Sequence, residues 1–114
     1  MYIIMRKDLA KAGWSGGSIA AQACHATTAV LAKHWTHPRV VSYLGDLANM
    51  HKVVLGVKNL GKLEGLCGQM AEAGIEFERW VEQPENTLTA VATLPQSRSQ
   101  AVPFFKAAKC ELWR

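Results

Sequence analysis

The sequence has little or none of what marks membrane proteins, secreted proteins and disordered chains. No apolar run in its 114 residues approaches the ~20 residues that a membrane span needs. We expect no signal peptide, because the first residues include neither a basic segment nor a small-residue cleavage site. Charged residues make up 19% and hydrophobic residues 49%, a balance that favours a folded core over disorder.

Cysteine is scarce and dispersed. Cys24, Cys67 and Cys110 are an odd number and form no C-x-x-C pair. Such usage does not fit a secreted disulfide framework and is typical of reduced thiols in a reducing compartment. We therefore expect a cytoplasmic protein, with a mitochondrial location as the alternative.

Basic residues outnumber acidic ones. Thirteen Lys and Arg against nine Asp and Glu give a net charge of +4, which favours an anionic partner, nucleic acid first. Five basic residues and two tryptophans lie within the first 39 residues: Arg6, Lys7, Lys11, Lys33, Arg39, Trp14 and Trp35. They are typical either of an RNA-backbone surface with stacking platforms or of a solvated face with tryptophans packed inside.

Apolar runs alternate with helical patterns along the chain. The patterns predict strands over 2–5, 52–57, 75–81 and 88–94, and helices over 18–35, from 37, over 59–73 and from about 96. Asn59 is a predicted N-cap and Gly74 a predicted helix stop. Pro103 is an obstacle inside the last helix.

This order, βααβαββα, predicts one α/β domain over residues 1–114. Long helical connections predict parallel neighbours among the first three strands, and the short 82–87 link predicts an antiparallel hairpin. We expect a mixed four-stranded sheet with helices on both faces.

A glycine-rich loop opens the first long helix. Gly13, Gly16 and Gly17 precede Ser18, and free N–H groups at a helix start attract a phosphate or an oxyanion. The spacing matches neither a P-loop nor a dinucleotide fingerprint. A plain turn with an N-cap is the alternative interpretation.

Ser18, Gln22 and His25 share one helical face at i, i+4 and i+7. Glu82 ends the third predicted strand, and the carboxyl ends of strands are where sites in α/β proteins gather. We expect the carboxylate to face Gln22. The alternatives are a helix face bonded to neighbouring backbone and a solvated turn carboxylate.

The pair Cys24 and His25 also invites a thiol-nucleophile interpretation, and His34 and His37 add a zinc interpretation. Both are weak, because adjacent helical side chains point ~100° apart and the spacing fits no structural zinc pattern.

The chain resembles the type 2 peptidyl-tRNA hydrolases. The resemblance runs through Arg6-Lys7-Asp8-Leu9, the helix Gly17–Ala26 (GSIAAQACHA), the strand His51–Leu55, and the stretch Gly74–Glu82. It covers essentially the whole chain. The turn Gln83–Asn86 is shared with the eukaryotic subgroup called peptidyl-tRNA hydrolase domain-containing protein 1.

The resemblance implies hydrolysis of the ester between a peptide and the tRNA 3′ end, without a metal or organic cofactor. No membrane partner is expected, because no apolar run is long enough to span a membrane. It implies that Gln22 matches the family's glutamine, Glu82 its aspartate and Thr89 a threonine after it. The family's helix-start lysine is Ser18 here, and its loop after the aspartate is shortened to Gln83–Asn86. Arg6, Lys7, Lys11 and His25 are the candidate RNA contacts.

Two functions follow. The first is a hydrolase in which Glu82 orients or deprotonates a water while Gln22 and loop N–H groups hold the carbonyl oxygen. The second is a binding module for RNA or protein on the same fold, favoured by Ser18 and the shortened loop. The oligomeric state is left open.

Overall fold

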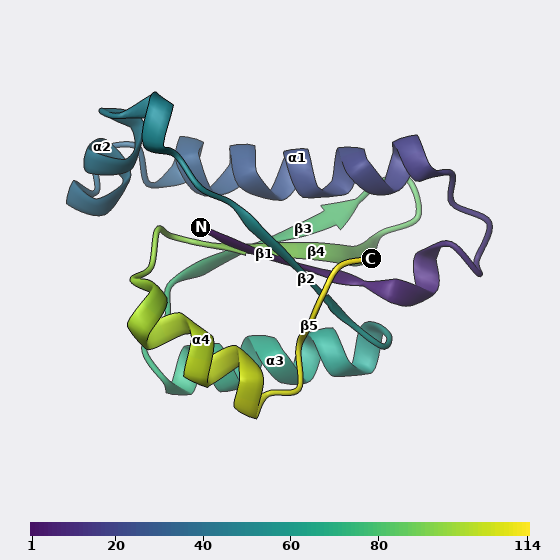
Figure 1. Cartoon of the computed structure of the whole chain (residues 1–114). Helices are drawn as coiled ribbons and strands as arrows, with labels where there is room; N and C mark the ends of the chain where they lie inside the picture. Colours follow the sequence, from purple (N-terminus) through teal and green to yellow (C-terminus); the bar gives the residue numbers. More distant parts are fainter.

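Residues 1–114 are all described by a computed structural model, whose centre is one mixed sheet of five strands (Figure 1). The strands are β1 (Tyr2–Arg6), β2 (Val53–Val57), β3 (Phe77–Glu82), β4 (Thr87–Thr93) and β5 (Glu111–Leu112). Their spatial order is β3-β4-β1-β2-β5. Only β1 and β2 pair in parallel, and every other pair is antiparallel.

Helices cover both faces of this sheet, as predicted. The helices are α1 (Gly16–Lys33), α2 (Pro38–Leu44), α3 (Leu60–Glu72) and α4 (Arg98–Ala107), with short 3-10 helices η1 (Lys7–Leu9) and η2 (Leu47–Asn49). Figure 1 shows α1 and α2 above the sheet and α3 and α4 below it. None of these helices combines the length and the apolar character needed to cross a membrane.

The helix ends follow from local chemistry. The Ser15 hydroxyl accepts from the N–H of Ser18 and caps α1. Asn59 caps α3 as predicted, and Gly74, with φ of 72°, follows its end in a conformation that favours glycine. Pro38 is tolerated at the first position of α2, where no helical hydrogen bond is lost.

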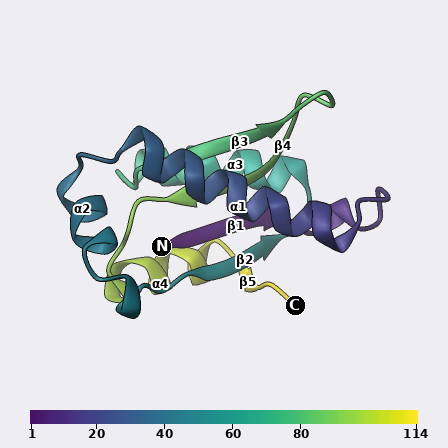
Figure 2. The same ribbon diagram turned by 90° about the horizontal axis from the view of Figure 1, so that it is seen from above.

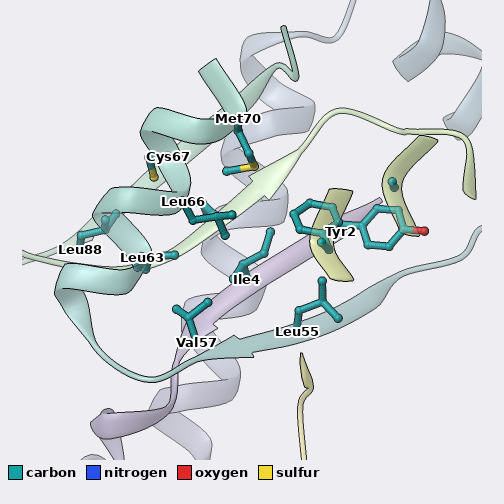
Figure 3. Packing of buried hydrophobic residues seen from close by; sticks show 12 residues of the cluster. Tyr2, Ile4, Leu55, Val57, Leu63, Leu66, Cys67, Met70 and Leu88 are labelled. Carbon is teal, nitrogen blue, oxygen red and sulfur yellow. The ribbon is translucent and has the colours of Figure 1, made fainter. Parts of the chain in front are cut away.

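Alternating residues of β1 feed two separate core layers. Ile3 and Met5 pack under α1 and α2, whereas Tyr2 and Ile4 pack against α3 and α4. Figure 3 shows the second layer, in which four side chains of α3 lie over β1, β2 and β4: Leu63, Leu66, Cys67 and Met70. Burial of both faces fixes the register of β1, because a slip of one residue would exchange the two layers.

The prediction of four strands and of parallel neighbours among the first three is wrong in detail. The two-residue strand β5 adds an antiparallel edge beside β2. The hairpin inserts β4 between β3 and β1, so β3 neighbours neither β1 nor β2. However, β3 and β1 are both antiparallel to β4. The carboxyl ends of β1, β2 and β3 therefore lie at one end of the sheet, where α1 also begins (Figures 1 and 2).

Candidate active site

Gln22 is a polar side chain buried beneath α1, with an exposed fraction of 1%. Its amide oxygen accepts from the Thr89 hydroxyl at 2.8 Å. Its amide nitrogen donates to Glu82 Oε2 at 2.8 Å and to the carbonyl of Ser18 at 3.1 Å. Both N–H groups are thus engaged within the protein, so Gln22 is a positioning residue for Glu82 rather than a free oxyanion donor.

Glu82 is half-buried at the end of β3, where its carboxylate accepts hydrogen bonds from side chains of α1 and of β3 itself. Besides the bond from Gln22, Oε1 accepts from the indole N–H of Trp80 at 3.3 Å. The bond from Gln22, together with that from Trp80 and the proximity of His25, holds the pKa of Glu82 below the usual glutamate value of 4.5. No lysine or arginine forms a salt bridge with Glu82. The carboxylate is therefore charged at neutral pH and is stabilised by hydrogen bonds.

A β-bulge brings Thr89 to this carboxylate–amide pair. In the β3–β4 ladder, Trp80 pairs with Ala90 whereas Val81 pairs with Leu88, which leaves Thr89 without a partner. Thr89 and Ala90 consequently both face α1, although they are consecutive in the strand. The bulge places the fully buried Thr89 hydroxyl against Gln22.

An aromatic wall borders the site. The rings of His25 and Trp80 stack with their centroids 4.5 Å apart and their planes at 23°. His25 is exposed on the outer side of this pair, while Trp80 packs against the core layer under α1. The pair presents a flat ring surface beside Glu82, and a base could stack on such a surface.

The start of α1 supplies free hydrogen-bond donors. The N–H of Ser18 bonds to Ser15 Oγ at 3.1 Å, and the two hydroxyls of these serines are 3.0 Å apart. The N–H groups of Gly16 and Gly17 have no partner in the protein. Ser15 therefore caps the start of α1, as the interpretation of a plain turn with an N-cap expected. The N–H groups of Gly16 and Gly17 remain free to bind a ligand.

Comparison with known proteins decides the family. The sequence profile of the family described as "Peptidyl-tRNA hydrolase PTH2" matches residues 1–110. The chain belongs to this PTH2 family. It is 38% identical over 107 residues to the human protein named "Putative peptidyl-tRNA hydrolase PTRHD1", covering 92% of this chain and 76% of that protein. The mouse protein of the same name matches with the same identity and coverage. The family and the subgroup indicated by the sequence are confirmed.

The candidate RNA contacts of this PTH2 chain separate in space. Arg6 makes two bonds of 2.9 Å to Asp8 and further bonds to the Thr87 hydroxyl and the Leu88 carbonyl, so it holds the start of β4 against the end of β1. Lys7 donates to Glu111 at 2.8 Å, and Lys11 is exposed. The structure therefore gives Arg6 a scaffolding contact, and it leaves Lys11 open to solvent.

The other residues of the expected basic surface lie elsewhere. Lys33 is bonded to Glu78, and Arg39 lies 3.8 Å from Glu76. Trp14 packs against the core under α1, whereas Trp35 is 70% exposed beyond the end of that helix. The five basic residues and two tryptophans therefore do not form a single surface.

The metal and thiol interpretations find no support in the PTH2 fold. His34 bonds to Glu78 at 2.9 Å, and the His37 side chain caps α2. No group of three or more His, Cys, Asp or Glu side chains lies close enough to hold a metal ion. Cys24 is exposed, and no hydrogen bond joins its thiol to a base.

Trp80 belongs to the site, although it was not among the candidate residues predicted from the sequence. The signal was present, because strand alternation puts Trp80 and Glu82, two residues apart, on one face. No pattern in the sequence indicated the bulge that brings Thr89 to Gln22.

Proposed function

We propose that this PTH2-family chain hydrolyses the ester between a peptidyl or N-acyl-aminoacyl group and the tRNA 3′ end. The observation that carries the proposal is the chain of bonds from Thr89 through Gln22 to a charged Glu82, with unpaired N–H groups at the start of the same helix α1 that carries Gln22. Family membership supports the same reaction. The human and mouse relatives carry peptidyl-tRNA hydrolase names.

In the proposed mechanism Glu82 orients the attacking water. A carboxylate whose pKa is lowered is a weak base, so its charge serves to align the water rather than to remove its proton before attack. The water oxygen bonds to the ester carbonyl carbon, the bond to the ribose oxygen breaks, and a proton ends on that oxygen. Gln22 keeps the carboxylate in place throughout.

The oxyanion is held by backbone in this proposal. Gly16 and Gly17 offer unpaired N–H groups at the positive end of α1, and preorganised donors of this kind stabilise developing charge. Ser18, at the position of the family's lysine, contributes its carbonyl to Gln22 but no charge. His25, stacked on Trp80, receives a base of the tRNA 3′ end.

The first test compares Glu82→Gln with wild type in release of the acyl group from N-acetyl-aminoacyl-tRNA at low salt. We expect turnover to fall by about 100-fold or more, because only the carboxylate supplies a charged acceptor for the water. Affinity for deacylated tRNA should stay within about twofold, since the neutral amide adds no bulk. Glu85→Gln is the matched control, because Glu85 is an exposed carboxylate in the adjoining turn. Equal turnover in Glu82→Gln would remove Glu82 from the mechanism.

A second candidate function is an RNA-binding module without hydrolysis. It is favoured by the internal engagement of both Gln22 N–H groups and by the absence of a lysine or arginine paired with Glu82. The same assay separates the two functions. No acyl release by wild-type protein that still binds tRNA would establish the module and end the hydrolase proposal.

A further inference from the structure

A pocket of about 690 Å³ lies at the end of the sheet where β1 and β2 terminate. Four lysines line it: Lys7, Lys11, Lys58 and Lys109. They come from η1 and the turn after it, the β2–α3 turn, and the end of α4. Asp8 and Glu111 are the acidic groups of its wall. We call this site the lysine pocket.

The lysine pocket and its immediate surroundings hold the excess charge of the molecule. Arg6 pairs with Asp8 at its edge, and Lys62 lines an adjoining hollow that shares Lys58 and Lys109 with it. These six basic and two acidic residues together carry a charge of +4, equal to the net charge of the chain. The remaining seven basic and seven acidic residues cancel. A positive region this concentrated attracts a multiply charged anion.

Most of these lysines are free to bind a ligand. Lys11, Lys58 and Lys109 are exposed and form no salt bridge, whereas Lys33 and Arg79, outside the pocket, are held by Glu78 and Glu64. Within the pocket only Lys7 is engaged, with Glu111. Three free ammonium groups are therefore gathered in the lysine pocket, whereas the equally free Lys52 and Lys106 lie elsewhere.

This end of the sheet is also the end that holds Glu82. From β3 to β2 there are three strand spacings, which amount to ~14 Å at about 4.8 Å each. One RNA strand can reach both places. The polar character of the pocket, with Val57 as its single hydrophobic residue, fits a phosphate rather than a base or an acyl chain.

We propose that the lysine pocket binds a backbone phosphate of the tRNA whose 3′ end lies at Glu82. The inference rests on the proposed function for the identity of the RNA. In this arrangement Lys11, Lys58 and Lys109 anchor the tRNA at a distance from the ester. Ser18 supplies no positive charge beside the reacting ester. The pocket lysines instead supply positive charge where the tRNA backbone binds.

The test measures the affinity of the full chain for deacylated tRNA across a salt series. The variant is Lys58→Ala with Lys109→Ala, and the control is Lys52→Ala with Lys106→Ala, two exposed lysines outside the pocket. We expect at least a tenfold loss of affinity at low salt and a shallower salt dependence for the pocket variant, since each phosphate contact adds about 0.7–0.9 to the slope. Equal losses in the two variants would overturn the proposal.

Two further variants distinguish a loss of charge in the pocket from a loss of folded protein. Lys58→Arg with Lys109→Arg preserves the charge and should retain most of the affinity. Glu111→Gln should tighten tRNA binding by removing a carboxylate from the pocket wall, whereas Glu85→Gln should do so less. A pocket that bound inorganic phosphate but whose loss left tRNA affinity unchanged would assign the site to a free anion and overturn the RNA assignment.

The hydrolysis assay separates this inference from the proposed function. Acyl release without lysine-dependent tRNA binding would leave the hydrolase standing and remove the pocket from it. Lysine-dependent tRNA binding by a protein that releases no acyl group would support the pocket and end the hydrolase proposal.

Discussion

At the residue scale, Gln22 determines what Glu82 can do. A buried amide with every hydrogen-bonding group engaged has one orientation, and that orientation presents an N–H group to the carboxylate. The same bond is the main reason why the pKa of Glu82 is lowered. Glu82 therefore stays charged down to pH values below the usual 4.5 for a glutamate.

Gln22→Leu should move the acid limb of the pH–rate profile to higher pH. Removing the donor from Glu82 raises the pKa of that carboxyl, so its proton is bound at a pH where the wild type is still active. The variant should also be less stable by about 1–3 kcal/mol, because the Thr89 hydroxyl loses its partner in the core. Stopped-assay rates over a pH series measure the shift. An unmoved acid limb would show that Gln22 does not act through Glu82.

Ser18→Lys should raise kcat/KM. Ser18 is exposed in the first turn of α1, so a lysine fits there, at a cost of about 0.3–1 kcal/mol for a cation at the positive helix end. The added charge would lie near the N–H groups of Gly16 and Gly17. Ser18→Ala is the control for losing the hydroxyl. A rate equal to that of the alanine variant would mean that the missing charge does not limit turnover.

At the element scale, two polar contacts fix α1 over the edge of the sheet. Gln22 and Glu82 join the helix to the end of β3, and Lys33 and His34 join the last turn of α1 and the residue after it to Glu78 near the start of β3. Burial acts to raise the pKa of Glu78, but the hydrogen bonds from His34 and Lys33 outweigh it and the pKa is lowered. The second contact therefore stabilises the fold through an ionised carboxylate.

Glu78→Gln should lower the free energy of unfolding by about 0.5–1 kcal/mol at neutral pH, the upper part of the range for ion pairs at a protein surface. Because the folded pKa is below the unfolded one, this contribution is complete above the unfolded value of 4.5 and is lost as the pH falls through the folded value. Urea unfolding of both proteins at neutral and strongly acidic pH measures it. A difference that persisted in acid would point to packing instead of charge.

At the scale of the whole molecule, the charge is polarised. The lysine pocket end carries the net positive charge, and the rest of the surface is balanced. Such a field increases the rate at which a polyanion meets that end of the sheet, which also holds Glu82. The uneven charge thus favours encounter complexes in which the tRNA lies close to the carboxylate.

Raising the salt concentration should lower kcat/KM for N-acetyl-aminoacyl-tRNA steeply and leave kcat within about twofold. Phosphate contacts weaken as counterions compete, whereas Glu82 acts only after binding. In the Lys58→Ala, Lys109→Ala variant the salt dependence of kcat/KM should flatten. Steady-state kinetics over a salt series measure both quantities, and a kcat that fell in parallel with kcat/KM would contradict this division.

The sequence predicted the parts of the site that depend on local periodicity. The shared face of Ser18, Gln22 and His25 and the position of Glu82 at a strand end follow from helical and strand geometry. The bulge at Thr89 could not be predicted, because β4 is buried on both faces and its apolar run does not show which face each residue takes.

The strand order and the short strand β5 could not be predicted from local periodicity either. A hairpin partner can pair on either side of a sheet, and two residues are too few for any alternation to be detected. The partners of Arg6 depend on β4 returning beside β1, a tertiary event that leaves no local pattern.

Gly56 lies at the floor of the lysine pocket, where a Cβ atom would be 2.8 Å from Cε and 2.9 Å from Cγ of Lys7. The Lys7 side chain runs across the bare backbone of β2 to reach Glu111. A single methyl group, introduced as Gly56→Ala, would therefore displace the ammonium group without removing it. Gly56→Ala would thus move one positive charge without changing the net charge. The effects of charge position and of total charge could then be measured separately.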